Sequence, residues 1–211
     1  MKILCVKRSH FDDLGSFQGF SPAVSHYNNL LFKPEFIERA DAELDPTYKQ
    51  IIPYAILRNS DRIFGDRIYS YQRGSKGGEK RLHAKRSIGW GGHVDESDIP
   101  AGDMIRFDPK KLLSRIIEAQ VREIDEEVKL MIGVERVTQV GWINEDDTPV
   151  GRVHIGMLNV IDLSDVQTRE LNADENEGIE DGRWTDLKTL LSERDVYELW
   201  SQHAIDWAVN A

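Results

Sequence analysis

The chain has 211 residues, with 37 acidic and 27 basic side chains, and its formal net charge is −10. This length suits one domain that buries roughly 70% of the surface of the unfolded chain. The negative charge argues against general nucleic-acid binding and against binding to anionic membranes. It also predicts that a polyphosphate ligand needs a cation to mediate its binding.

A single cysteine, Cys5, excludes an internal disulfide bond. The first residues lack the apolar run of a signal peptide. No stretch approaches the roughly 20 apolar residues of a transmembrane helix. We therefore expect a soluble, cytoplasmic protein without a membrane partner.

Residues 1–48 alternate short apolar groups with turn formers and show no clear period. We expect an irregular N-terminal extension that packs on a domain of residues 49–211, with a short helix near residues 35–43. The runs 50–57 and 63–72 are rich in Ile, Tyr and Phe and predict two neighbouring strands. Pro53 interrupts the first run, which favours a position at a sheet edge or a bulge.

A long amphipathic helix is predicted over residues 108–130. Asp108 is the expected N-cap, and Pro109 is the expected first helical residue. At about 100° per residue, one stripe of the helix is apolar, so the helix should pack on a sheet. The stripe consists of Leu113, Ile117, Ile124 and Val128, and Val121 lies beside it.

Two further runs, residues 137–143 and 150–163, are rich in Val and Ile and should form a hairpin. A C-terminal helix within residues 193–209 should cover the sheet. We find no internal repeat and no linker, so the pattern of strands and helices predicts one α/β unit.

Three glutamates lie along one flank of the long helix. Glu123, Glu126 and Glu127 are at positions i, i+3 and i+4, so their carboxylates crowd onto one side. Like charges at this spacing destabilise a helix by about 0.2–0.5 kcal/mol per pair. A bound divalent cation turns this repulsion into attraction, and oxygen ligands suit Mg²⁺, with Mn²⁺ as a substitute. The alternative is a solvated acidic face, which many helices present.

The segment from Arg122 to Glu127, together with the upstream pair Gly91 and Gly92, resembles the Nudix box, G-x5-E-x7-R-E-U-x-E-E-x-G-U, where U is a bulky apolar residue. The core R-E-U-x-E-E is complete, and Ile124 is its apolar residue. The resemblance covers roughly residues 50–205. It implies a Nudix-type α/β/α sandwich with a mixed β-sheet. The residues of the strands before the box further resemble those of a subgroup of predicted phosphoesterases.

The chain departs from the usual box in three places. Gly92 and Arg122 are thirty positions apart instead of fourteen, so an insert of roughly residues 95–110 should loop out over the site. Ser114 occupies the position of the first box glutamate and cannot form an ion pair with Arg122. We expect Glu118 to replace it as the partner of the arginine. Lys129 replaces the glycine that usually ends the helix.

The resemblance implies roles for the box residues. Glu126, Glu127 and the main-chain carbonyl of Gly91 would bind the metal ion. Glu123 would be a further ligand or the base that activates water, and Glu127 is another candidate for the base. Arg122 would orient the catalytic glutamates.

A fourth metal-binding carboxylate commonly comes from the loop before the tryptophan segment of the family. Glu175, Glu177 and Glu180 all lie in this loop, and Glu177 is the first choice from its distance to Trp184. A merely exposed acidic loop is the competing interpretation.

Four basic or histidine residues near the box could contact substrate phosphates. They are Arg73, Arg81, Arg86 and His93. Surface solubility explains any single arginine equally well, and a hydrogen-bonded structural role explains His93. Base stacking could come from Tyr54, Trp90 or Trp142, although core packing is the commoner fate of such aromatic residues.

The leading hypothesis is therefore a Mg²⁺-dependent Nudix pyrophosphohydrolase, a phosphoesterase that cleaves a diphosphate linkage in a small nucleotide derivative. One alternative is a nucleotide-binding sensor without catalysis on the same scaffold. A second alternative resembles isopentenyl diphosphate isomerase, which needs a catalytic cysteine, and here only Cys5 could serve. Homodimers are frequent in the family, and we keep a homodimer as an expectation.

Overall fold

The computed structural model describes residues 1–62, 65–74, 85–100, 108–128, 132–164 and 179–211. Its strands form one mixed sheet, whose main path runs β10-β5-β4-β9-β8-β2. The parallel pair β4 and β9 lies at the centre, with antiparallel neighbours on both sides. The strands of this path are β2 (Gly19–Ser21), β4 (Tyr48–Asp61), β5 (Gly65–Arg73), β8 (Val137–Asn144), β9 (His154–Asp162) and β10 (Ile179–Asp186).

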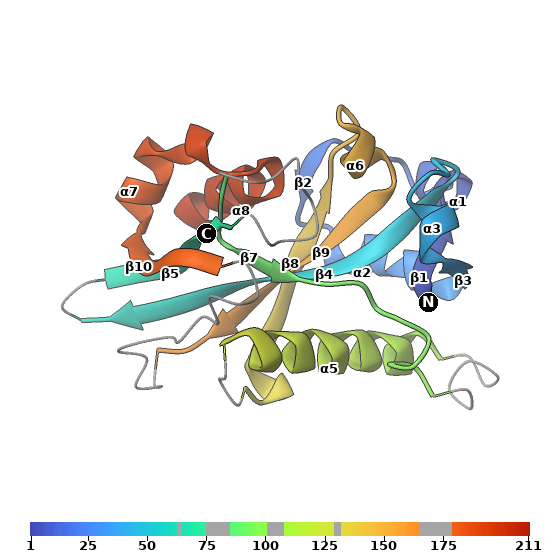
Figure 1. Cartoon of the computed structure of the whole chain (residues 1–211), viewed down its shortest axis with the longest axis horizontal. Helices are drawn as coiled ribbons and strands as arrows, with labels where there is room; N and C mark the ends of the chain where they lie inside the picture. The colour runs from blue at the N-terminus through green and yellow to red at the C-terminus, as the bar shows by residue number, and fades with distance from the viewer. Residues whose placement is uncertain (63–64, 75–84, 101–107, 129–131, 165–178) are drawn as a thin grey trace.

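Helices cover both faces of this sheet (Figure 1): α5 lies on one face, and α7 and α8 lie on the other. Their bounds are Pro109–Val128, Leu187–Ser192 and Leu199–Asn210, respectively. Along β4, Ala55 and Leu57 join the core cluster beneath α5, whereas Tyr54 and Ile56 join the cluster beneath α8. The alternation of side chains along a strand therefore supplies both layers. The predicted α/β/α sandwich is confirmed.

Pro53 lies in the central strand and not at an edge or a bulge, so that prediction was wrong. The backbone N–H of Gln50 donates to the oxygen of Val153 on the β9 side of β4, at 2.7 Å. Because N–H groups alternate in direction along a strand, the nitrogen of Pro53 faces the opposite side. There β1 (Lys2–Lys7) pairs with β4 only up to Gln50, and β7 (Gly89–Gly91) pairs beyond Pro53. The proline occupies the gap between them and costs no ladder hydrogen bond.

The first 48 residues are more regular than predicted. β1 pairs with β4 and β3, and β2 pairs with β8, so residue 48 marks no break in the sheet. The helix expected near residues 35–43 is a strand followed by one helical turn. The other elements of this segment are α1 (Arg8–Asp13), α2 (Val24–Tyr27), the 3-10 helix η1 (Asn28–Phe32), β3 (Pro34–Glu38) and α3 (Arg39–Ala42).

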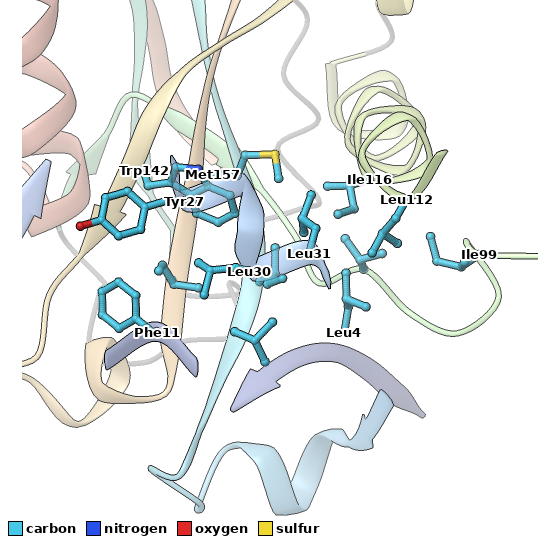
Figure 2. Packing of buried hydrophobic residues seen from close by; sticks show 14 residues of the cluster. Leu4, Phe11, Tyr27, Leu30, Leu31, Ile99, Leu112, Ile116, Trp142 and Met157 are labelled. Atoms are coloured by element: carbon cyan, nitrogen blue, oxygen red, sulfur yellow. The ribbon is translucent and has the colours of Figure 1, made fainter. Parts of the chain in front are cut away.

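Figure 2 shows the N-terminal segment packed beneath the first half of α5. Leu31 of η1 lies in one buried cluster with Leu112 and Ile116 of α5. Leu113 and Ile117, which were predicted to form the apolar stripe here, are only partly buried. Two apolar residues stand side by side at each of these turns, so periodicity alone did not identify the buried one.

The remaining elements complete the two layers. The predicted hairpin of β8 and β9 is confirmed, with α6 in its connection, and Asp108 caps α5 by accepting from the N–H of Lys110 at 2.9 Å. No helix in the described part of the chain is long and apolar enough to cross a membrane. These remaining elements are β6 (Arg86–Ser87), α6 (Pro149–Arg152) and the 3-10 helices η3 (Val134–Arg136) and η5 (Arg194–Val196).

Candidate functional site

Arg122 connects α5 to the inserted segment. Its guanidinium group lies 2.9 Å from Asp98 Oδ1, 2.8 Å from Glu123 Oε1 and 3.1 Å from Glu126 Oε1. Burial lowers the pKa of Arg122, but hydrogen bonds to Glu126 and Asp98 outweigh it and raise this pKa. One permanently charged side chain therefore gathers two box carboxylates on the same flank of the helix.

The sequence predicted Glu118 as the partner of Arg122, but Glu118 pairs with Arg115 at 2.7 Å. The partner of Arg122 outside the box is Asp98, which the sequence did not reveal. Ile99 is buried in the cluster beneath α5 and anchors the insert there. The carboxylate of Asp98 also accepts from the backbone N–H of Asp95 at 3.0 Å. The insert thus supplies the acidic partner that the serine in the box cannot provide.

Glu123 lies against the diglycine turn. A Cβ atom at Gly92 would be 3.2 Å from Glu123 Oε2, and a Cβ atom at Gly91 would be 2.6 Å from the carbonyl oxygen of Pro53. The two glycines therefore let β7 approach β4 and let a carboxylate approach the backbone after β7. The carboxylate and this backbone meet at one place, as a metal site between them requires.

The charge of Glu127 affects Tyr71, whose hydroxyl contacts the first residue of β7. Burial raises the pKa of Tyr71 to about 12, and the charge of Glu127 adds to this shift. The hydroxyl of Tyr71 donates to the oxygen of Gly89 at 2.6 Å. Glu126 is the most exposed of the three glutamates, with 62% of its side chain accessible. These donors are all oxygens, so the residues present fit a hard divalent cation such as Mg²⁺ or Mn²⁺.

A cavity of about 620 Å³ opens beside the diglycine turn. This volume suits a small-molecule ligand of nucleotide size. The residues that line it include Gly91, Gly92, Arg39, Arg73, His93 and Trp200.

Arg73 and Glu198 form an ion pair in this cavity, with 3.3 Å between Arg73 Nε and Glu198 Oε2. Glu198 Oε1 also accepts from Ser87 Oγ at 2.6 Å and from the hydroxyl of Tyr54 at 3.1 Å. Burial lowers the pKa of Arg73, but the charges of Tyr71 and Glu198 outweigh it and raise this pKa. Arg73 is therefore a fixed cation in the wall of the cavity.

His93 lines the same cavity and is neutral near neutral pH. Burial lowers its pKa to about 3, and the positive charges of Arg39 and His154 contribute further. Its ring nitrogen Nε2 is hydrogen-bonded to Gln50 Oε1 at 2.8 Å. His93 is therefore a hydrogen-bonded structural residue and also lies where a ligand in the cavity could contact it.

Arg86 is not among the residues that line this cavity, and its role in substrate binding stays a prediction. Its guanidinium group is almost fully buried and donates to Asp181 Oδ2 at 2.6 Å and to Ser70 Oγ at 3.0 Å. It joins β6 to β5 and β10. Arg81 and Glu177, the other predicted contacts, lie outside the described residues.

Of the three aromatic candidates for base stacking, Tyr54 lines the cavity, and sequence reasoning missed a second aromatic residue there. Trp90 and Trp142 are fully buried in the core, as their competing interpretation predicted. Trp200 also lines the cavity and packs edge-on against Tyr54, with 5.5 Å between ring centroids. The sequence predicted that Trp200 lies in the C-terminal helix. It did not predict that Trp200 lies near Gly91 and Gly92, because the two segments are far apart along the chain.

Comparison with known proteins agrees with this arrangement. No family model matches the chain. Protein YmaB from Bacillus subtilis (strain 168) is 33% identical over 200 residues, which are 90% of this chain and 88% of YmaB. The crystal structure of Tm1382, a candidate Nudix hydrolase, has a TM-score of 0.75 and 28% identity, and the match covers 100% of this chain and 99% of that chain.

A bifunctional NMN adenylyltransferase/ADP ribose pyrophosphatase from Francisella tularensis, solved with AMP and a manganese ion, shares the fold. Its TM-score is 0.51 at 16% identity, over 77% of this chain and 41% of that chain. With the box residues, the sheet order and these matches, the chain belongs to the Nudix superfamily.

Proposed function

We propose that the protein is a hydrolase that cleaves a diphosphate linkage in a nucleotide derivative with the help of Mg²⁺ or Mn²⁺. The observation that carries this proposal is the position of Glu123. Its carboxylate is held by Arg122 and lies against Gly92, which also lines the cavity. The turn therefore contacts a carboxylate of α5 and also borders a cavity of ligand size, although the α5 glutamates are not among the residues that line this cavity.

The cation would be held by the carbonyl of Gly91 and by Glu123, Glu126 and Glu127, with Glu177 as a further candidate. When bound, it would neutralise phosphate charge and lower the pKa of a bound water. Arg122 would keep Glu123 and Glu126 on one flank of the helix despite their repulsion, and its ion pairs with both carboxylates support this role.

The cavity would supply the substrate contacts. Arg73 is charged and only partly exposed, so it can donate to phosphate oxygens at low cost in desolvation. Trp200 offers an aromatic surface for a base or sugar. Either Glu123 or Glu127 would accept the proton of the attacking water, and both lie beside β7.

Two features bear on the rival functions. Cys5 lies in β1 and does not line the cavity, and burial raises the pKa of its thiol to about 12. A catalytic thiolate of the isomerase type is therefore disfavoured. A sensor without catalysis would use the same cavity, and turnover alone separates it from an enzyme.

The test is to incubate the purified protein and Mg²⁺ with nucleoside triphosphates, dinucleoside polyphosphates, ADP-ribose and nucleotide sugars, and to measure the released products. We expect turnover of at least one compound and a loss of about 100-fold or more in Glu127→Gln. Tight binding without product release from any compound would favour the sensor.

A further inference from the structure

A second group of metal-binding side chains lies in the cavity, separate from the glutamates of α5. Glu43, His93 and His154 each offer a ligand atom, and these atoms lie within 4.8 Å of one another. Within the described ranges, no other three residues of this kind are gathered as closely. Among the described residues, the box glutamates do not form such a group.

We propose that Glu43, His93 and His154 bind a divalent transition-metal ion of the Zn²⁺ type. The three residues come from separate parts of the chain: the end of α3, the turn after β7 and the start of β9. They converge where β4 passes from β1 to β7. The fold therefore builds this group from elements that are already fixed by sheet pairing.

Both histidines have a ring nitrogen hydrogen-bonded to an oxygen. His154 Nδ1 donates to the oxygen of Val150 at 2.7 Å, and His93 Nε2 donates to Gln50 Oε1 at 2.8 Å. Because these oxygens only accept, the proton of each ring is fixed on the nitrogen that faces them. At His154 the other nitrogen then carries the lone pair that a metal ion needs. At His93 the nitrogen that lies 3.9 Å from Glu43 Oε1 is Nε2 itself, so a metal ion bound there must displace the bond to Gln50. Metal-binding histidines in proteins show this second hydrogen bond to an oxygen.

Gln50 provides an independent indication of a ligand. It is fully buried, and its Nε2 has no hydrogen-bond partner among the described residues. A buried donor without an acceptor costs about 1–3 kcal/mol. An oxygen bound to the metal, from water or from a ligand in the cavity, would satisfy it.

The donor set predicts the choice of metal. Two imidazoles and one carboxylate favour Zn²⁺, Co²⁺ or Fe²⁺, whereas Mg²⁺ prefers oxygen ligands only. The glutamates of α5 and this group should therefore bind different metals. Three protein ligands leave one or more positions open, as in zinc sites that bind water or substrate.

Arg39 is the competing cation at this site. Its Nε lies 3.6 Å from Glu43 Oε1, and the same oxygen lies 3.9 Å from His93 Nε2. A metal ion must displace this contact. Removing the arginine should therefore strengthen metal binding, whereas removing any of the three ligands should weaken it.

The experiment is calorimetric titration of the full-length, chelator-treated protein with ZnCl₂ in an excess of Mg²⁺. The visible spectrum of the Co²⁺ form reports the ligands. We expect one Zn²⁺ per chain and a dissociation constant raised about tenfold or more in Glu43→Gln and in His154→Gln. Arg39→Gln should lower the dissociation constant.

Glu43 is one-third exposed, so Glu43→Gln should fold even if a histidine variant does not. His26→Gln is the matched control, because His26 is not among the residues that line the cavity and its ring nitrogen Nε2 is hydrogen-bonded to the oxygen of Leu14 at 2.7 Å. No Zn²⁺ binding by the wild type, or equal binding by wild type and Glu43→Gln, would overturn the proposal. Zn²⁺ binding is read without substrate, so it does not depend on the proposed hydrolysis.

Discussion

At the scale of single residues, the contact between Arg122 and Asp98 decides how the box works in this chain. The box arginine keeps its glutamates in place, but its own anchor comes from the insert. Asp98 is held by a backbone N–H on one oxygen and by the arginine on the other. A substitution at Asp98 should change the position of the Arg122 guanidinium group and the charge beside it without creating a cavity in the core.

Asp98→Asn should lower kcat about tenfold while the melting temperature changes little. The pair is partly exposed at Arg122, so its contribution to stability is about 1 kcal/mol or less. The loss would arise because Arg122 no longer holds Glu123 in one orientation. Steady-state kinetics on a substrate found in the panel measure this effect.

Glu118→Gln is the matched control for Asp98→Asn. It breaks the ion pair with Arg115 on the same helix, at 2.7 Å, and leaves the ion pairs of Arg122 with Asp98, Glu123 and Glu126 in place. Its kcat should equal that of the wild type. Equal losses in the two variants would show that Asp98 has no special part in positioning the arginine.

At the scale of elements, Gly91 at the end of β7 and Gly92 directly after it have separable tasks. Gly91→Ala sets a Cβ atom 2.6 Å from a backbone oxygen of β4, and a backbone strand cannot yield locally. This variant should lose about 1–3 kcal/mol in the free energy of unfolding. Chemical denaturation followed by tryptophan fluorescence measures the loss.

Gly92→Ala meets the flexible end of Glu123 instead, at 3.2 Å. The side chain can turn away, so the free energy of unfolding should change by less than about 1 kcal/mol, while activity falls. If Gly92→Ala retained full activity, the contact between Glu123 and the turn would have no catalytic meaning.

The elements also show what the sequence could predict. The Arg-Glu-Ile-x-Glu-Glu run and the cap at Asp108 predicted α5, because a long periodic helix carries its own signal. Pro53 was misplaced, since only the partners of β4 reveal that its nitrogen faces a gap. The strands of the first 48 residues are three to six residues long, too short for a visible period.

At the scale of the whole molecule, a buried charge joins the N-terminal segment to the rest of the sheet. Lys49 is fully buried, and its Nζ lies 2.9 Å from Asp146 Oδ1. Arg8 of α1 meets the other oxygen of the same carboxylate at 2.8 Å. Asp146 therefore connects β4, α1 and the turn after β8.

Asp146→Asn should destabilise the protein by about 3 kcal/mol, because it leaves the buried charge of Lys49 without a carboxylate. Burial raises the pKa of Asp146, but hydrogen bonds from Asn144, Lys49 and Arg8 outweigh it, so the pKa lies below 3.8. The stabilisation is therefore present above this value and is lost as pH falls through the pKa of the folded state.

Denaturation of wild type and Asp146→Asn at decreasing pH measures this effect. The difference between them should be constant from neutral pH down to about 4 and should shrink below 3.8. A constant difference through the acid range would mean that the ion pair is not its source.

The candidate site was only partly readable because its parts are far apart in the sequence. The box gave Arg122 and the three glutamates, since adjacent helical turns bring them together. Asp98, Trp200 and the histidine group depend on contacts between distant segments. The contact between Arg86 and Asp181 was unreadable for the same reason, because the two residues are 95 positions apart.

The central claim is that the carboxylates of α5 bind Mg²⁺ beside the diglycine turn. Thermal unfolding of wild type and Glu127→Gln, each with a chelator and with Mg²⁺, tests it most directly. Removing one charge from a repelling cluster should leave the melting temperature in chelator equal or higher. Mg²⁺ should raise the melting temperature of the wild type but clearly less that of the variant. A variant that melts earlier in chelator and gains as much from Mg²⁺ would contradict the account.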